Sequence, residues 1–482
     1  MIEGKTLTAS AKLEAVYAKA ARRIIPFLIL LFVVAWLDRV NVGFAKLQMV
    51  SDLGFSDAVY GFGAGIFYVG YLLFEIPSNL FLTRIGARKT IARITILWGL
   101  TSIATMFVKS ATGFYVLRFL LGAFEAGLYP GVILYLTYWF PSRRRGQMLG
   151  AFMTAVPIAG ILGGPISGWI MATMGGRSDL ANWQWLFLLE GLPSIVMGFL
   201  TLLIVVDKPA QADWLTDQEK QLITADLEAD HLQAGPRQHA FVTALRSPRV
   251  WLLTIIYFGL VSANPTLGFW GPTIITDLGV KGNLMIGLLS AVPYLVSVVG
   301  IVWVGRHSDR KLERRYHCAL SCLTAAAGLV LIGVFHNSPV FAFAALILGV
   351  TGVLSAFSPF WQMPAMLLSG TAAAGGIALI NSIGNLSGWL APFLVGWLKD
   401  LTGTTSSGLY VVAGFEVIAA VMILKVMDSD RPPAAATRRA VETITKHDSG
   451  EASPLLTKAE LSKLRDKGKR RSTAAACFEG VR

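Results

Sequence analysis

Three polar residues interrupt the first apolar stretch of the chain. Asp38, Arg39 and Asn41 stand in the sequence WLDRVNVGF, directly after a run of aliphatic and aromatic residues. An ionisable group near the centre of a bilayer costs at least about 2.5–3.5 kcal/mol on insertion scales, so each one is a candidate for function. Asp38 and Arg39 are therefore candidates for a buried anion-binding or proton-binding site.

A second pair of charges stands in a later apolar stretch. Arg118, Gly122 and Glu125 follow one another at i, i+4 and i+7, which places them on one helix face with the glycine leaving space between the charges. A helix advances about 1.5 Å per residue, so these charges reach a depth similar to that of Asp38 and Arg39. We expect all four charges to face one central cavity.

These residue types suit the transport of an organic anion. Two buried arginines can grip a planar carboxylate through paired donors, and acids in a low-dielectric site can exchange protons. Moving a monoanion into a negative interior costs about 2.3 kcal/mol per 100 mV, so accumulation needs a co-transported cation, and a dianion needs two. The alternative is that the charges only neutralise one another, although an apolar pair would hold two helices at least as well.

Three further glutamates fall in apolar stretches. Glu190 and Glu416 lie near helix ends or alone, and we expect them to be hydrogen-bonded packing residues. Glu75 fits a packing role and a functional role equally well.

The composition predicts an integral membrane protein built only of helices. Of 482 residues, 54% are hydrophobic and 15% charged, and the mean hydropathy is +0.59. A helix needs about 20 apolar residues to span the bilayer. Twelve stretches meet this length approximately, at 24–46, 58–82, 91–108, 112–139, 147–173, 185–206, 250–274, 284–304, 317–335, 340–367, 373–398 and 406–427.

The distribution of basic residues predicts the orientation in the membrane. Lys and Arg gather in the N-terminal segment and in the loops after the second, fourth, sixth and eighth stretches. Cytoplasmic loops carry this excess, so we expect both termini in the cytoplasm of a multi-pass protein of the inner (plasma) membrane. The net charge of +13 then reflects topology, and the expected partners are the lipid bilayer and a small organic anion, with no nucleic acid.

The chain divides into two six-helix halves and three polar segments. We predict a cytoplasmic N-terminus at 1–23, a first bundle at 24–206, a linker with a surface helix at 207–249, a second bundle at 250–427 and a basic, mostly disordered tail at 428–482. Basic residues after the second and eighth stretches match at an offset of 226, as in Arg84 and Arg310. This repeat predicts two pseudo-symmetric bundles.

The sequence offers no signature of an enzyme. It contains no set of nucleophile and base, no nucleotide-binding loop and no His or Cys cluster with metal-ligand spacing, so we expect no catalytic residues, no metal and no cofactor other than a proton as coupling ion. The three cysteines offer no disulfide framework.

Several sequence motifs resemble those of the major facilitator superfamily, and within it those of the anion:cation symporter branch, which includes tartrate, phthalate and hydroxyphenylacetate permeases. The resemblance covers roughly residues 22–427. It rests on LDRVNVGFA, GYLLFEIPSNL, RFLLGAFEAGLYPG, LTYWFPSRRRG, WQWLFLLEGLP and INSIGNLSGWLAPFLVGWL. It implies the major facilitator fold, transport by rocking of two bundles, and a monomer.

The resemblance also implies roles for individual residues. Arg39 and Arg118 would bind the substrate carboxylate, Asp38 and Glu125 would take part in proton coupling, and two more residues would lie near the substrate, Tyr71 and Asn381. The superfamily's cytoplasmic loop motif is degraded after the second stretch, where Asn79 and Thr83 replace its usual Gly and Asp. The motif positions that remain are Gly86, Arg88, Gly305, Asp309 and Arg310.

We predict a secondary transporter that takes up a tartrate-like dicarboxylate or an aromatic carboxylate with protons. Two alternatives remain open. An organic-anion exchanger or facilitator would keep the arginines but would be indifferent to the proton gradient. A membrane sensor would bind the anion and signal through the basic tail.

Overall fold

The computed structural model describes residues 2–234, 245–367 and 371–426, and every regular element in these segments is a helix. Twelve spans among the described residues are long and apolar enough to cross a membrane, which confirms the predicted all-α membrane architecture. The predicted tail at 428–482 lies outside the described residues. The helices are α1 (Ile2–Leu53), α2 (Asp57–Ile85), α3 (Ala87–Ala104), η1 (Thr105–Phe107), α4 (Ala111–Glu125), α5 (Leu128–Trp139), α6 (Ser142–Met153), α7 (Ala155–Thr173), α8 (Asn182–Ile204), η2 (Pro209–Gln211), α9 (Asp217–Ala234), α11 (Pro248–Asp277), α12 (Asn283–Lys311), α13 (Arg315–Val334), α14 (Pro339–Leu367), α15 (Thr371–Gly384), α16 (Ser387–Thr402) and α17 (Thr405–Val426).

The helix bounds differ from the predicted ones in two respects. The first helix begins at Ile2 rather than near residue 24, because the preceding segment contains no Pro and only one Gly. Three predicted spans, at 112–139, 147–173 and 373–398, are each divided into two helices, namely α4 and α5, α6 and α7, and α15 and α16. The surface helix predicted in the linker is present as α9.

Short polar residues fix several helix ends. The Ser56 hydroxyl accepts a hydrogen bond from the Val59 amide at 3.2 Å and so caps α2, and Ser110 caps α4 in the same way. Gly86 joins α2 to α3 at a φ of 91°, which a residue with a side chain would adopt only with strain.

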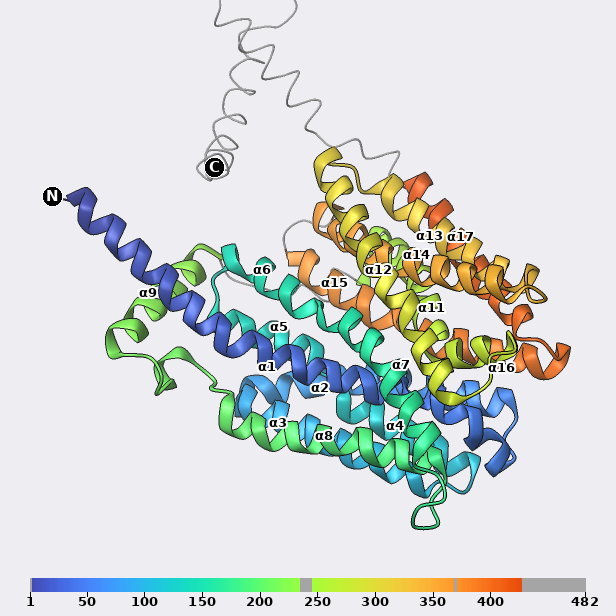
Figure 1. Cartoon of the computed structure of the whole chain (residues 1–482). Helices are drawn as coiled ribbons and strands as arrows, with labels where there is room; N and C mark the ends of the chain where they lie inside the picture. The colour runs from blue at the N-terminus through green and yellow to red at the C-terminus, as the bar shows by residue number, and fades with distance from the viewer. Residues whose placement is uncertain (1, 235–244, 368–370, 427–482) are drawn as a thin grey trace, which may run out of the picture. The chain divides into compact units, whose positions relative to one another are not determined.

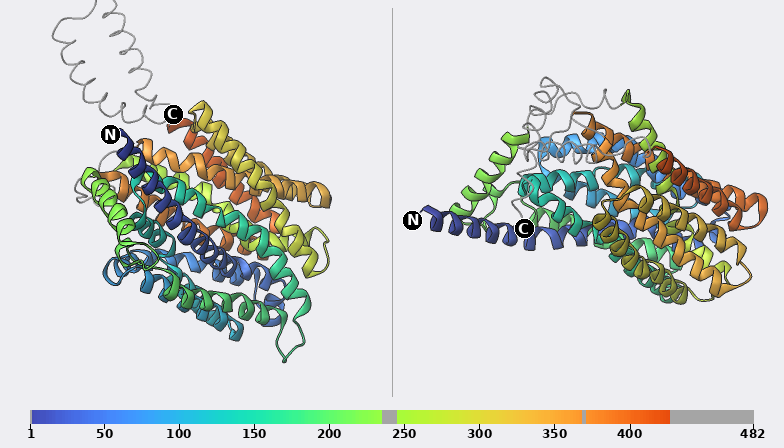
Figure 2. Two further views of the ribbon diagram at one scale, coloured as in Figure 1. Left: turned by 60° about the vertical axis from the view of Figure 1, so that its left-hand side comes forward. Right: turned by 90° about the horizontal axis from the view of Figure 1, so that it is seen from above.

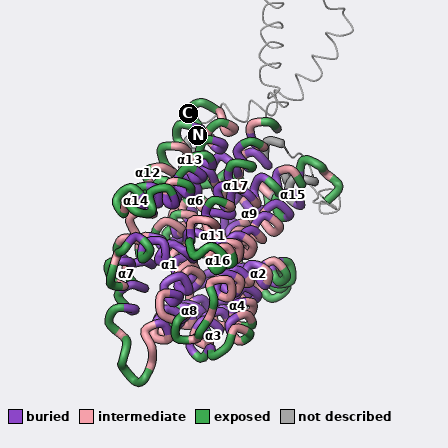
Figure 3. The backbone as a smooth tube through the Cα atoms, turned by 90° about the vertical axis from the view of Figure 1, so that its right-hand side faces the viewer, coloured by how far each residue is buried: buried purple, intermediate pink, exposed green. Residues whose placement is uncertain are grey.

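Consecutive and distant helices pack within each half of the chain. In the first half α3 lies beside α8, and α1 runs along α6 and α7 (Figures 1 and 2). In the second half α14 contacts α12 and α13. Buried residues line the interior between the helices, whereas the loop between α7 and α8 is exposed, as Figure 3 shows. Many large apolar side chains point outward, among them Leu73, Val299 and Trp303, as expected for helices that face lipid.

The two halves meet along pairs of helices in which glycines allow close approach. The pairs are α2 with α16, α7 with α12, and α1 with α11. A Cβ atom on Gly61 would lie 2.4 Å from the Pro392 carbonyl oxygen, and one on Gly164 would lie 2.4 Å from the Gly287 carbonyl oxygen. These contacts lie toward the end of the bundle where α1 finishes and α2 begins, which we call the distal end.

Charged groups join the halves at the distal end. Both carboxylate oxygens of Asp400, in α16, accept hydrogen bonds from the first amides of α2, at 3.0 Å from Asp57 and 2.8 Å from Ala58. The Asp57 carboxylate pairs with Lys46 at 2.7 Å and with Lys399 at 3.6 Å. A carboxylate at a helix N-terminus is favourable, so Asp400 stabilises α2 from the opposite half.

The linker helix α9 is attached to the first half by ion pairs. Asp226 binds the Arg143 guanidinium at 2.7 Å, and Asp230 binds Arg145 at 2.7 Å. Lys19 of α1 donates to Glu219 at 2.9 Å, and this hydrogen bond lowers the pKa of the Glu219 carboxyl. The linker therefore packs on the N-terminal part of α1 and on the first turn of α6.

We predict that Gly164→Ala separates α7 from α12 and lowers the melting temperature of the purified protein. The added methyl group meets the Gly287 carbonyl, and overpacking of this kind costs about 1–3 kcal/mol. Gly146→Ala is the control, since a Cβ there has no neighbour within 4 Å. Equal melting temperatures for the two variants would contradict the close packing of the halves.

Candidate substrate-binding site

A buried ion pair lies at the centre of the first half. The Arg39 guanidinium, from α1, binds one carboxylate oxygen of Glu125, from the end of α4. Only 13% of the Arg39 side chain and 1% of the Glu125 side chain are exposed, so the two charges neutralise each other largely out of water. The second carboxylate oxygen, Oε2, has no hydrogen-bond partner among the described residues.

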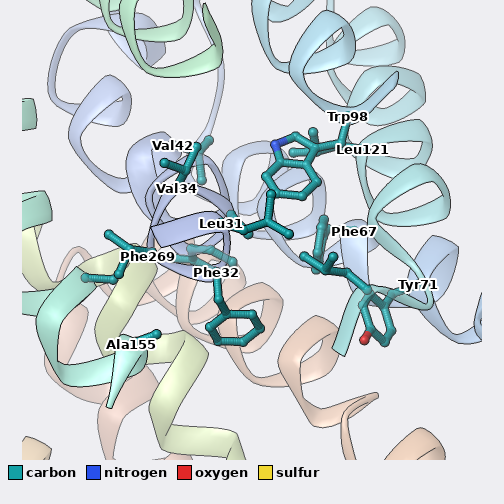
Figure 4. Packing of buried hydrophobic residues seen from close by; sticks show 14 of the residues in the cluster. Leu31, Phe32, Val34, Val42, Phe67, Tyr71, Trp98, Leu121, Ala155 and Phe269 are labelled. Atoms are coloured by element: carbon teal, nitrogen blue, oxygen red, sulfur yellow. The ribbon is translucent and has the colours of Figure 1, made fainter. Parts of the chain in front are cut away.

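Aromatic rings surround the Arg39 guanidinium. Its central carbon lies 5.1 Å from the ring centres of Trp36 and Phe67 and 5.9 Å from that of Tyr71. Figure 4 shows Phe67 and Tyr71 on the same side of α2, with the Tyr71 hydroxyl pointing away from the aliphatic core. These rings favour a cation by their quadrupoles and also keep water away from the ion pair.

Arg118 adds unused donors to the same region. Its side chain is fully buried, and Nη2 donates to the Ala64 carbonyl at 3.1 Å and to the Arg39 carbonyl at 3.5 Å. Nε and Nη1 have no partner among the described residues. A buried guanidinium with two free nitrogens, Nε and Nη1, can hold a carboxylate through paired hydrogen bonds, and each bond to a charged group contributes about 1.5–3 kcal/mol.

The fourth charge of the predicted cavity faces elsewhere. The Asp38 carboxylate accepts hydrogen bonds from Trp98 Nε1 at 2.6 Å, from Ser102 Oγ at 2.8 Å and from Ser194 Oγ. These donors belong to α3 and α8, so the expectation that all four charges line one cavity is wrong for Asp38. Neighbouring residues on a helix point about 100° apart, which follows from 3.6 residues per turn and turns Asp38 away from Arg39.

The helix that carries Glu125 is interrupted directly after it. Gly127 has a φ of 89°, and Pro130 has no amide to continue the hydrogen-bond ladder, so α4 ends at Glu125 and α5 starts at Leu128. The break was not predicted, although the stretch GLYPG contains the glycine and the proline that cause it. A broken helix inside a membrane bundle is typical of transporter binding sites.

The two predicted neutral contacts come from opposite halves. Tyr71 lies near Arg39, as described above, whereas Asn381 is on α15 and donates to Glu75 Oε1 at 3.5 Å. Asn385, in the break between α15 and α16, donates to Asn381 Oδ1 at 3.1 Å. The structure thus brings Arg39, Arg118, Glu125 and Tyr71 together, and connects Asn381 to them through α2.

The residues of the loop motif occupy helix ends in both halves. A Cβ on Gly86 would lie 2.5 Å from the Asp207 carboxylate, which accepts the Arg88 amide at 2.8 Å at the start of α3. Gly305 lies within α12, Arg310 lies in its last turn, and Asp309 pairs with Arg314 at 2.7 Å. Asp207 follows α8 and was not predicted.

The two other buried glutamates occupy equivalent positions in the two halves. Glu190 and Glu416 differ by 226 residues, which is the offset of the repeat. Ser167 donates to Glu190 at 2.6 Å, as expected for a hydrogen-bonded packing residue. Glu416 is fully buried on α17 near Cys322, and neither of its carboxylate oxygens has a hydrogen-bond partner among the described residues, so the expectation of a hydrogen-bonded packing residue is wrong for Glu416.

Comparison with known proteins decides the family. Residues 28–392 match the model of the Major Facilitator Superfamily. The chain belongs to this superfamily. It is a multi-pass membrane transporter rather than an enzyme, which confirms the predicted transport class and the prediction that the chain is not an enzyme.

Individual relatives and a solved structure agree with this assignment. A protein of Agrobacterium vitis named "Putative tartrate transporter" is 46% identical over 425 residues, which cover 88% of this chain and 94% of that protein. The "Inner membrane transport protein RhmT" of Escherichia coli is 38% identical over 415 residues, with coverage of 86% and 96%. The inward-open structure of the xylose transporter XylE from E. coli has a TM-score of 0.68 at 14% identity, with coverage of 84% and 96%, and shows the shared fold.

We predict that Ser194→Ala lowers the melting temperature of the transporter, because Asp38 loses a donor and stays buried. Loss of a hydrogen bond to a buried carboxylate costs about 1.5–3 kcal/mol. The matched control is Ser297→Ala, since this serine is equally buried but donates only to the Tyr294 carbonyl of its own helix. A larger decrease in the control would mean that Asp38 does not depend on its donors.

Proposed function

We propose that this transporter takes up a small organic anion together with protons by alternating access. The observation that carries the proposal is the geometry at Arg39, Arg118 and Glu125. Arg39 alone binds the Glu125 carboxylate, and three guanidinium nitrogens, Nε of Arg39 and Nε and Nη1 of Arg118, have no hydrogen-bond partner among the described residues. A substrate carboxylate supplies the negative charge that this cluster lacks. The name of the Agrobacterium relative supports a tartrate-like substrate.

Proton coupling would follow from competition for Arg39. The deprotonated Glu125 carboxylate occupies the Arg39 guanidinium, and a proton on Glu125 weakens that pair and frees Arg39 for the substrate. The proton and the anion then enter the site together, and neither charge is left buried alone. Asp38 is separated from the arginines, so in this proposal it takes part in proton coupling by holding α1 to α3 and α8, and it neither contacts the substrate nor carries a transported proton.

Alternating access would require the distal contacts between the halves to open. The glycine-lined pairs of helices and the Asp57, Lys399 and Asp400 bonds join the halves at that end. In the proposed orientation both termini are cytoplasmic, the membrane is the inner (plasma) membrane, and the distal end faces outward. The Escherichia coli relative is named as an inner membrane protein, which supports this location.

The proposal is tested by uptake into proteoliposomes of labelled tartrate, phthalate and hydroxyphenylacetate, with and without an inward proton gradient. We predict that wild type accumulates one of these acids only with the gradient. Arg39→Lys loses at least tenfold in apparent affinity, because lysine cannot make paired hydrogen bonds to a carboxylate. Glu125→Gln retains exchange of labelled for unlabelled acid but loses gradient-driven accumulation.

Other results of the same experiment identify the alternatives. Uptake that ignores the gradient, with Glu125→Gln equal to wild type, would mean an exchanger or facilitator in which the acids are structural partners. Binding without uptake would favour a sensor. Deletion of residues 432–482 distinguishes a transporter from a sensor. A transporter retains uptake without the tail, whereas a sensor loses only its signal.

A further inference from the structure

A third carboxyl group close to the site has no cationic partner. Glu75 lies on α2, and its side chain is 7% exposed. Among the described residues, the side chains that hold its carboxylate are Ser382 and Asn381. Burying a carboxyl group without a cation is expensive.

Both donors to Glu75 come from the other half of the transporter. Ser382 Oγ donates to Oε2 at 2.6 Å, and Asn381 Nδ2 donates to Oε1 at 3.5 Å. These residues are on α15, which is separated from α16 by the break after Gly384. Glu75 is therefore a direct polar connection between the two halves.

This connection lies farther from the distal end than the close contacts between α2 and α16. Toward the distal end, Gly65 approaches Trp389 of α16 so closely that a Cβ would lie 2.7 Å from its carbonyl oxygen. Glu75 is ten residues further along α2, about 15 Å at 1.5 Å per residue, and contacts α15 instead. A change at Glu75 thus acts where the two halves separate.

The site and the connection are one helical turn apart. Tyr71, which lies over the Arg39 guanidinium, precedes Glu75 by four residues. The titratable groups that face Glu75 are Tyr71 from its own helix and Tyr257 from α11, and neither carries a charge at neutral pH. Two basic residues of helices that pack against α2 have other partners: Arg39 of α1 binds Glu125 of α4, and Arg93 of α3 donates to Ser78.

We propose that Glu75 binds and releases a proton in the transport cycle, as a second coupling site beside Glu125. The carboxylate takes a proton from the aqueous side to which the site is open and becomes a neutral carboxyl group. Bonds to a charged acceptor are roughly twice as strong as neutral ones, so the proton weakens the hold on Ser382 and Asn381 and lets α15 move relative to α2. Release of the proton restores the connection.

A second proton has an energetic role. A dianion such as a dicarboxylate needs two compensating cations to enter a negative interior without electrical cost, and Glu125 supplies one. This inference rests on the proposed function, because a second coupled proton has meaning only if transport is coupled to protons at all.

The test measures how many protons accompany each anion. Proteoliposomes with a clamped membrane potential are given a pH difference of one unit, and the anion gradient that stops net uptake is measured. Each coupled proton contributes a factor of about ten to this gradient. We predict that Glu75→Gln balances at a gradient tenfold smaller than wild type, while exchange of labelled for unlabelled anion continues.

Control variants separate a proton site from a structural contact. Ser382→Ala keeps the acid, so its balancing gradient equals that of wild type, although its rate changes. Glu190→Gln changes a buried carboxyl group outside the site, which Ser167 holds within one half, and it also keeps the wild-type gradient.

Three results would overturn the inference. An unchanged balancing gradient in Glu75→Gln would make Glu75 a structural contact. Loss of exchange in that variant would show that Glu75 is needed for anion binding or folding. A wild-type gradient that is independent of pH would refute the proposed function itself, and this outcome is distinguishable from the first two because it requires no variant.

Discussion

The structure depends on the need to neutralise charge away from water. Arg39, Arg118 and Glu125 are almost completely buried, and the three together carry one unbalanced positive charge. The protein solvates this excess poorly, because two aromatic rings lie near Arg118 and two of its nitrogens, Nε and Nη1, have no hydrogen-bond partner among the described residues. In the proposed function, a substrate carboxylate is the anion that completes this cluster.

The helices around this cluster are shaped by backbone features rather than by side-chain size. The break at Gly127 ends α4 at Glu125, and the break after Gly384 ends α15 close to Asn381. Glycines on α2 and α7 let the halves approach until backbone atoms touch at the distal end. Rigid packing at one end and interrupted helices near the site are the arrangement that rocking of two bundles requires.

The sequence predicted the architecture well and the site in part. Spans of twenty apolar residues are a strong signal, and the i, i+7 spacing correctly placed Arg118 and Glu125 on one face. Asp38 was misplaced because depth along a helix was considered without its rotation. The connection from Glu75 to Ser382 and the caps from Asp207 and Asp400 join residues far apart in the sequence, and no local pattern contains such pairings.

The polar contacts between the halves differ in charge with their distance from water. At the distal end, where ions stay partly hydrated, the contacts between halves use full charges, as in the pair of Lys399 and Asp57. Near the site, the donors that the described part of the second half offers to Glu75 are the neutral groups of Ser382 and Asn381. Separating an ion pair inside the membrane would cost several kcal/mol per charge, whereas separating neutral donors from a protonated acid costs much less. In the proposed cycle, a proton on Glu75 lowers the free-energy cost of separating the halves at a depth where a salt bridge would prevent it.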